Sequence, residues 1–280
     1  MSLKEDIQDK LAQLGSSPKR SLGQNFLIDE NIVKRIVEAV KGCQPNSLVE
    51  VGPGLGSLTE RLRGLDVPLL LIELDREFAG LWRGEGLELL EEDALMVDWN
   101  SLNLAQGTTL VSNLPYQISS SIVIDRCLGP LAIESMVLMF QKEVAQRIMA
   151  GPKTKEYGLL SVVAQLFWRV RAVCEAGPRC FWPAPQVASR VLLFNRLEDA
   201  PNCSGQALLR FVKAAFSHRR KILWKNLSGE YSRFGVEMDL ALRVGQDLGL
   251  GHQVRAEELS PRQFRLLFEE LSRAGKENQQ

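Results

Sequence analysis

Four consecutive residues, Asn113-Leu114-Pro115-Tyr116, follow a short apolar run and carry groups suited to binding an aromatic amine. The Asn113 side-chain oxygen and the Leu114 carbonyl could accept the two amine hydrogens and so favour a pyramidal nitrogen with a localised lone pair. Pro115 restricts Leu114 to extended geometry, and a purine could stack on Tyr116, which is worth about 1–3 kcal/mol. The tetrapeptide is therefore a candidate site for attack by the exocyclic amine of adenine, although Asn and Pro are also common in strand-ending turns.

Such an attack needs no strong base, because the ammonium that it forms loses its proton easily. Catalysis would then rest on positioning and electrostatics. A base in folded RNA has to leave its stack to react, and a second ring could hold it. Phe181, in the segment Phe181-Trp182-Pro183-Ala184-Pro185, is our candidate for this ring. The same segment could equally be an edge loop that packs two aromatic side chains.

A glycine-rich turn, Gly52-Pro53-Gly54-Leu55-Gly56, follows another apolar run. Glycines let a backbone approach a ligand closely and adopt positive φ. The turn is no dinucleotide fingerprint, since Ser57 stands where G-x-G-x-x-G has its last glycine, and no P-loop, since it has no lysine nearby. A purely structural turn remains an alternative.

Acidic residues at or just past the ends of three successive predicted strands favour a ligand-binding role for this turn. They are Glu50, Glu73 and Asp93. Glu73 could accept both hydroxyls of a ribose, and Asp93 could accept a hydrogen bond from an adenine amine. We expect Asp75 and Glu92 to be solvated neighbours. The pattern resembles S-adenosylmethionine methyltransferases, whose cofactor carries no phosphate and so requires no lysine.

Short apolar runs alternate with amphipathic segments through the first two-thirds of the chain. Strands are predicted at 47–51, 68–73, 87–91, 108–112, 135–140, 169–175 and 189–196. Helices are predicted at 30–40, 57–65, 77–83, 119–127, 143–150 and 159–167. This alternation indicates an α/β fold with a mostly parallel sheet covered on both faces. Doubly wound sheets of this kind bind ligands in loops such as the one after the first strand.

A linker-like patch at residues 198–205 separates this region from a purely helical one. Helices are predicted there at 206–216, 219–227, 239–248 and 261–274. We therefore predict two domains: a methyltransferase domain over residues 1–198 and a small helical RNA-binding domain over residues 199–280.

Composition excludes several classes of protein. The 280 residues are 45% hydrophobic and 24% charged, which is typical of a soluble globular protein. The apolar runs are too short for a membrane span of about 20 residues. The two histidines lie far apart, and the five cysteines are scattered, so we expect no metal site and reduced thiols in the cytoplasm. The cysteines are Cys43, Cys127, Cys174, Cys180 and Cys203.

Formal net charge is zero, but the charges are unevenly distributed. Residues 200–229 contain six Lys or Arg and no acid, and residues 141–196 contain nine against three Glu. One basic side can hold a phosphate backbone whatever the total charge, because the field acts over about 8–10 Å. A solvated helix face would explain a single run of this kind. Two runs in one half of the chain favour a nucleic-acid partner.

Seven motifs, in order, resemble the ribosomal RNA small-subunit adenine dimethyltransferase (KsgA) family over nearly the whole chain. They are Gly23-Gln24-Asn25-Phe26-Leu27, Glu50-x-Gly52-Pro53-Gly54-x-Gly56, Glu73-x-Asp75, Asp93-Ala94, Asn113-Leu114-Pro115-Tyr116, Phe181-x-Pro183-x-Pro185-x-Val187-x-Ser189 and Phe216-x-x-Arg219-Arg220-Lys221. Asn25, where eukaryotic and archaeal relatives tend to carry His, favours the bacterial branch.

The resemblance implies a Rossmann-like domain with a seven-stranded sheet, S-adenosylmethionine as cofactor and a role in small-subunit biogenesis. The implied reaction transfers four methyl groups to two adjacent adenines in a hairpin loop near the 3′ end of 16S ribosomal RNA. By motif position, the implied cofactor contacts are Asn25, Leu27, Gly52, Gly54, Glu73, Asp93 and Asn113. The implied RNA contacts are Arg219, Arg220 and Lys221. We expect a monomer with no membrane partner.

Two other classes of protein remain as alternatives. The macrolide-resistance methyltransferases of 23S ribosomal RNA share the fold and chemistry, but their tetrapeptide more often reads Asn-Ile-Pro-Tyr. A non-catalytic ribosome-assembly factor could keep the fold, although the intact tetrapeptide and acids argue against a loss of catalysis. Trp182 and Trp224 are small departures from the family pattern that could alter RNA contacts.

Overall fold

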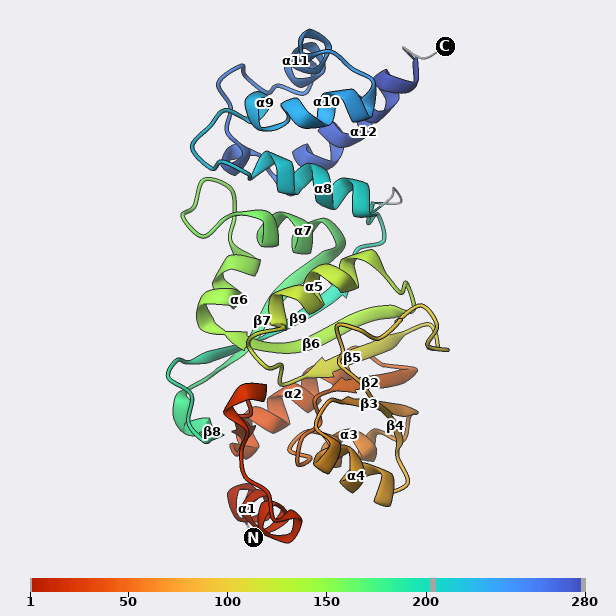
Figure 1. Cartoon of the computed structure of the whole chain (residues 1–280), viewed down its shortest axis with the longest axis vertical. Helices are drawn as coiled ribbons and strands as arrows, with labels where there is room; N and C mark the ends of the chain where they lie inside the picture. Colours follow the sequence, from red (N-terminus) through yellow and green to blue (C-terminus); the bar gives the residue numbers. More distant parts are fainter. Residues whose placement is uncertain (1, 202–204, 278–280) are drawn as a thin grey trace. The chain divides into compact units, whose positions relative to one another are not determined.

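The computed structural model describes residues 2–201 and 205–277, so Cys203 lies outside the described residues (Figure 1). Contacts divide the chain into two compact units. The first consists of Met1–Ala145 and Arg169–Arg196, and the second of Gln146–Trp168 and Leu197–Gln280. The second unit thus includes a segment that the sequence analysis assigns to the first domain. Whether residues 199–280 form a domain of their own stays a prediction.

A seven-stranded sheet forms the first unit, with the strand order β4-β3-β2-β5-β6-β9-β7 (Figure 1). Parallel pairing joins β4 through β6, and β9 runs antiparallel to β6. The strands are β2 (Ser47–Val51), β3 (Leu69–Glu73), β4 (Glu88–Glu91), β5 (Thr108–Ser112), β6 (Ile133–Gln141), β7 (Trp168–Ala176) and β9 (Ser189–Arg196). Each lies within two residues of its prediction, and the predicted α/β class is confirmed.

The central strands could be predicted from the sequence because they are buried along their whole length and therefore appear as continuous apolar runs. Every residue of β2 and β5 is buried, as expected for parallel strands with both faces covered. Polar side chains inside the sheet are paired with each other: Ser47 with Thr108 at 2.6 Å and Thr109 with Ser135 at 2.7 Å between hydroxyl oxygens. The strand order reverses between β2 and β5, which places a ligand-binding crevice at their carboxyl ends.

Most helices of the α/β region follow their predictions. They are α2 (Glu30–Gly42), α4 (Arg76–Gly84), α5 (Ser119–Leu128), α6 (Lys142–Met149) and α7 (Leu159–Phe167). The helix predicted at 57–65 is shorter, because α3 (Thr59–Leu62) continues only as a 3₁₀ turn, Arg63–Leu65. No described helix is long and apolar enough to cross a membrane.

Two features of the first unit were missed. Helix α1 (Leu3–Leu14) begins at a capping box made by Ser2 and Glu5. Strands β1 (Phe26–Leu27) and β8 (Phe181–Trp182) pair antiparallel in a separate small sheet. Two-residue strands are too short to show periodicity, so only the structure reveals that these segments meet.

Five helices of the second unit pack around aromatic side chains: α8 (Gly205–Ala215), α9 (Leu223–Asn226), α10 (Ser228–Phe234), α11 (Met238–Asp247) and α12 (Pro261–Glu277). The rings of Phe211, Phe234 and Phe268 meet edge-on at 5.5–5.7 Å between centroids. Such edge-to-face pairs are favourable beyond their buried area. Helix α10 was not predicted.

The helix predicted at 219–227 is wrong at its start, because residues 217–221 form a turn and α9 begins only at Leu223. The Asn226 side chain donates hydrogen bonds to the main-chain oxygens of Ala215 and His218, at 2.7 and 3.0 Å. These bonds satisfy carbonyls at the end of α8 and hold the chain in the turn.

Trp224 belongs to the core of the second unit. Its side chain is buried, and its indole N–H donates to the Gly251 oxygen at 3.1 Å. The ring packs against Gly245 of α11, where an added Cβ would lie 2.1 Å from a ring atom. The Trp224 ring is therefore not available for a direct contact with RNA.

We predict that Gly245→Ala destabilises the protein. In an open helix this change would stabilise by about 0.5–1 kcal/mol, but here the methyl group collides with Trp224 and should cost about 1–3 kcal/mol. Thermal unfolding should show a Tm lowered by several degrees. Gly80→Ala is the control, since Gly80 is an exposed position within α4 with nothing near its missing Cβ. Equal Tm values for the two variants would contradict the packing argument.

Candidate functional site

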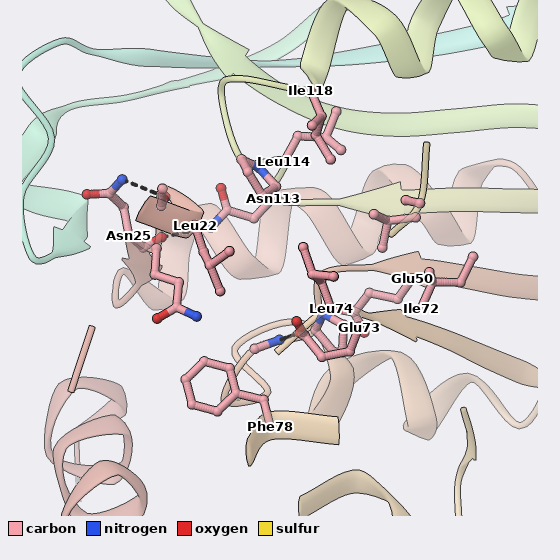
Figure 2. A pocket seen from close by; sticks show the side chains of 18 of the residues that line it. Leu22, Asn25, Glu50, Ile72, Glu73, Leu74, Phe78, Asn113, Leu114 and Ile118 are labelled. Carbon is pink, nitrogen blue, oxygen red and sulfur yellow. Dashed lines mark hydrogen bonds between the residues drawn. The ribbon is translucent and has the colours of Figure 1, made fainter. Parts of the chain in front are cut away.

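A pocket opens at the carboxyl ends of β2, β3 and β5, where the strand order reverses (Figure 2). Its lining includes the glycine turn, the stretch before α2 and the tetrapeptide, together with residues at the ends of β3 and β4. It brings together all seven predicted cofactor contacts, namely Asn25, Leu27, Gly52, Gly54, Glu73, Asp93 and Asn113. Leu114, Pro115 and Tyr116 line it as well.

The glycine turn needs its glycines. Gly52, Gly54 and Gly56 have φ of 68°, 53° and 95°, in the left-handed region that favours glycine. A Cβ on Gly56 would lie 2.6 Å from the ring of Trp82. The Trp82 indole N–H also donates to the Gly54 oxygen at 2.9 Å. This buried tryptophan of α4 therefore holds the turn in place, a role for which the sequence offered no signal.

Glu73, at the end of β3, is oriented by two main-chain donors. One carboxylate oxygen accepts from Gly54 N at 3.0 Å (Figure 2), and the other from Asp75 N at 2.9 Å. Burial raises the pKa of Glu73, while these hydrogen bonds favour its charged form. Each oxygen has a second lone-pair direction that could accept from a ligand hydroxyl.

Asp75 is buried, so the expectation that it is a solvated neighbour is wrong. Its carboxylate accepts from Lys19 Nζ at 2.9 Å and from Gln24 Nε2 at 2.8 Å. The Gln24 side-chain oxygen in turn accepts from Lys19 N at 2.8 Å. Asp75 therefore ties the stretch that leads to Asn25 to the start of α4. Gln24, in the motif Gly23-Gln24-Asn25-Phe26-Leu27, thereby has a structural role that the sequence alone does not indicate.

The Asn113 amide is oriented by the same stretch. Asn113 Nδ2 donates to the main-chain oxygen of Asn25 at 3.0 Å, and Asn25 Nδ2 donates to the Gly23 oxygen at 3.0 Å. Figure 2 shows Asn25 and Asn113 on one side of the pocket and Glu73 and Phe78 on the other. Since the nitrogen end is held by the protein, the oxygen end remains as an acceptor.

Tyr116 is half-buried and anchored through its hydroxyl, which lies 2.9 Å from the Ser189 hydroxyl. Burial raises the pKa of Tyr116, so the ring stays neutral. Ser189 is fully buried at the start of β9 and is the last residue of the Phe181 motif. This contact links two motifs that are 73 residues apart.

The family model described as ribosomal RNA adenine dimethylase matches residues 15–272. The chain belongs to this family. A relative from Bdellovibrio bacteriovorus, described as ribosomal RNA small subunit methyltransferase A, is 49% identical over 265 residues, which cover 95% of this chain and 96% of that protein. The family expected from the seven motifs is therefore confirmed.

Two solved structures share the architecture. A dimethyladenosine transferase from Plasmodium falciparum has a TM-score of 0.75 at 24% identity and covers 89% of this chain and 98% of that one. The 23S rRNA methyltransferase ErmE has a TM-score of 0.60 at 25% identity, covering 88% and 99%. This chain thus has the fold of the S-adenosylmethionine-dependent methyltransferases.

Phe181 does not line the pocket of this dimethylase family member. Its side chain is 3% exposed and packs in the apolar core, where β8 pairs with β1. Its ring therefore lies in the core instead of beside a base, which matches the edge-loop interpretation and not the second stacking ring. The neighbouring Trp182 is half-buried against the cluster around Phe26.

The three predicted RNA contacts lie together in the second unit. Arg219, Arg220 and Lys221 belong to the turn between α8 and α9, and all three are exposed. Arg219 differs from the other two, because its guanidinium bonds to Glu257 and to two main-chain oxygens.

The sequence analysis names Glu50 as one of three acids after strands but predicts no contact for it; in the structure it lines the pocket and is 2% exposed. Burial, with a smaller contribution from the charge of Glu73, raises the pKa of Glu50 to about 8. Its Oε2 has no hydrogen-bond partner among the described residues. Buried unpartnered acids are uncommon and mark functional sites. The available signal was its position two residues before Gly52.

We predict that Glu50→Gln stabilises the free protein increasingly as pH rises from 5 to 8. A carboxyl whose pKa is raised on folding binds its proton more tightly in the folded state, so its contribution to stability is greatest below the unfolded pKa of about 4.5 and is lost as pH approaches 8. Each pH unit in this window is worth up to about 1.4 kcal/mol.

The measurement is Tm at pH 5 and pH 8 for both proteins, with Glu38→Gln on the exposed face of α2 as control. The Tm difference between variant and wild type should grow by several degrees across the window only for Glu50→Gln. A difference that is the same at both pH values would show that Glu50 is ionised in the folded protein.

Proposed function

We propose that this protein uses S-adenosylmethionine to dimethylate the N6 amines of two adjacent adenines in a hairpin loop near the 3′ end of 16S ribosomal RNA. This would take place in the cytoplasm during small-subunit biogenesis. The observation that carries the proposal is the oriented amide of Asn113, which shares its pocket with Glu73 and the glycine turn. A small-subunit substrate is supported by the name of the relative at 49% identity.

The lining residues fit this cofactor. Glu73 offers two oriented oxygens for ribose hydroxyls, and Asp93, just past β4, could accept an adenine amine. Gly52 and Gly54 allow the backbone to approach closely. Glu50 holds an unpartnered carboxyl oxygen suited to the ammonium of the methionine part. When bound, the cofactor supplies a methyl group on a cationic sulfur.

The tetrapeptide then acts on the target amine. The Asn113 oxygen and the Leu114 carbonyl accept its two hydrogens, and the bond from Asn113 to Asn25 keeps the amide from turning its donors inward. The Tyr116 ring, held through Ser189, supports the base by stacking. As the nitrogen gains positive charge in the transition state, it faces acceptors that are already in place. The proton is lost to water afterwards.

A large-subunit substrate is the second candidate, because the ErmE structure shares this fold. At 25% identity, however, it is more distant than the small-subunit relative at 49%. The Asn-Leu-Pro-Tyr form of the tetrapeptide also favours the small subunit.

We predict that the wild-type protein forms dimethyladenosine at the two adjacent adenines of small subunits isolated from a strain lacking this modification. Asn113→Ala should lower kcat by about 10²–10³-fold, since it removes one oriented acceptor of the transition state. The assay uses methyl-labelled cofactor and maps the modified nucleosides by mass spectrometry. Glu38→Gln, at a position that does not line the pocket, should keep wild-type activity.

Large-subunit RNA from the same strain provides the discriminating arm of this experiment. Label only in that RNA would place the protein with the resistance methyltransferases. Cofactor binding without label in either RNA would indicate a binding factor that has lost the reaction.

A further inference from the structure

Two basic runs that are far apart in sequence meet in the second unit. Lys153 and Lys155 lie in the loop between α6 and α7, and residues 219–221 lie in the turn between α8 and α9 (Figure 1). Arg219 joins them, because its Nη1 donates to the Lys155 oxygen at 2.6 Å and its Nη2 to the Thr154 oxygen at 2.9 Å. The basic run at residues 219–221, which in sequence suggests a solvent-exposed charge cluster, therefore also connects its turn to the loop between α6 and α7.

The third hydrogen bond of Arg219 completes a clamp, in which Arg219 and Glu257 together hold residues 153–155. Its Nε donates to the Glu257 carboxylate at 2.6 Å, and the Glu257 main-chain oxygen accepts from Lys153 N at 2.8 Å. The Tyr157 hydroxyl donates to the Leu259 oxygen at 2.7 Å and so holds the other end of the loop. With its charge opposed by Glu257 and three donors directed at protein, Arg219 has little left to offer a ligand.

The backbone at Lys153 is a second, independent observation. Its φ of 66° lies in the left-handed region, which glycine and asparagine adopt more readily than lysine does. Lys153 and Lys155 are both exposed, and neither side chain forms an ion pair within residues 2–201 and 205–277. A lysine that occupies a strained position without an internal partner points to a partner outside the chain.

Charge identifies the chemistry of that partner. Lys153, Lys155, Arg220 and Lys221 face solvent around the clamp, and Glu156 is the one acid of residues 151–157. Compact ammonium groups on an exposed loop suit a phosphate backbone. Building on the proposed function, we propose that residues 151–157 are an RNA-contacting loop that binds backbone phosphates through Lys153 and Lys155. In this proposal Arg219 is a positioning residue for the loop.

The lysines are tested by Lys153→Gly and Lys155→Gln, singly and together. Affinity for unmethylated small subunits is measured over a series of salt concentrations. The plot of log K against log salt concentration has a negative slope, and each lost phosphate contact reduces its magnitude by about 0.7–0.9. The double variant should therefore reduce this magnitude by about 1.4–1.8. Lys153→Gly should keep or raise Tm, because glycine accepts this φ, so its loss of binding cannot come from unfolding. Glu156→Gln, which removes a negative charge from the same loop, should not weaken binding.

The clamp is tested by Arg219→Gln and Glu257→Ala, with hydrogen exchange at the Lys153 amide as the structural readout. Both variants should speed that exchange. Both should also reduce the magnitude of the salt slope by more than the loss of one phosphate contact would. Removing an acid normally strengthens RNA binding, so weaker binding by Glu257→Ala is the signature of a clamp. Arg219→Gln that costs a single contact and leaves the exchange unchanged would make Arg219 an RNA contact and overturn the positioning role.

The two proposals fail in distinguishable ways. If the wild type methylates small subunits but both lysine variants keep its salt slope, the loop assignment is overturned and the enzymatic function stands. If the wild type methylates neither subunit, the proposed function is overturned whatever the slopes show.

Discussion

The hydrogen bond from the Asn113 side chain to the main-chain oxygen of Asn25 decides which end of the amide the pocket presents. An amide has donors at one end and an acceptor at the other, and an amine that must lose its planarity needs the acceptor. Asn25 is placed by the β1–β8 pairing and by the bonds of Asp75 to Lys19 and Gln24. The proposed chemistry thus depends on contacts between residues more than 50 positions apart, which position the N-terminal stretch over the sheet edge.

Two buried acids set the electrostatics of the same pocket. Glu73 is compensated by main-chain donors, whereas Glu50 keeps one oxygen without a partner. Burying a charge without a partner is costly, so Glu50 in the free protein favours its neutral form, as its raised pKa indicates. A cationic ligand would reverse this preference and recover the lost stability on binding. The proposed cofactor, which carries two positive groups, is a ligand of this kind.

The parts of the fold that the sequence predicted are those governed by local patterns. Continuous apolar runs marked the sheet, and glycines with acids after strands marked the pocket, because each of these signals lies within a few residues. The missed parts depend on individual tertiary contacts, most of them long-range. The burial of Phe181 follows from a two-residue strand pairing, the burial of Trp224 from a glycine on another helix, and the turn at 217–221 from the side chain of Asn226. The first two partners lie outside any window in which periodicity can be read, and the third is a single polar side chain, which periodicity does not detect.

Asp75 and Arg219 show the same limit for charged residues. Both stand in sequence contexts that suggest solvent or a ligand, and both direct their side chains at segments more than 50 residues away. In each case the charged group holds a segment without regular secondary structure: the stretch that leads to Asn25 in one unit and residues 151–157 in the other. A carboxylate or guanidinium can bind several groups in defined directions, so such residues are well suited to hold irregular backbone that lacks secondary structure. In the proposed function, the chemistry then falls to Asn113 in the first unit and RNA binding to the exposed lysines in the second.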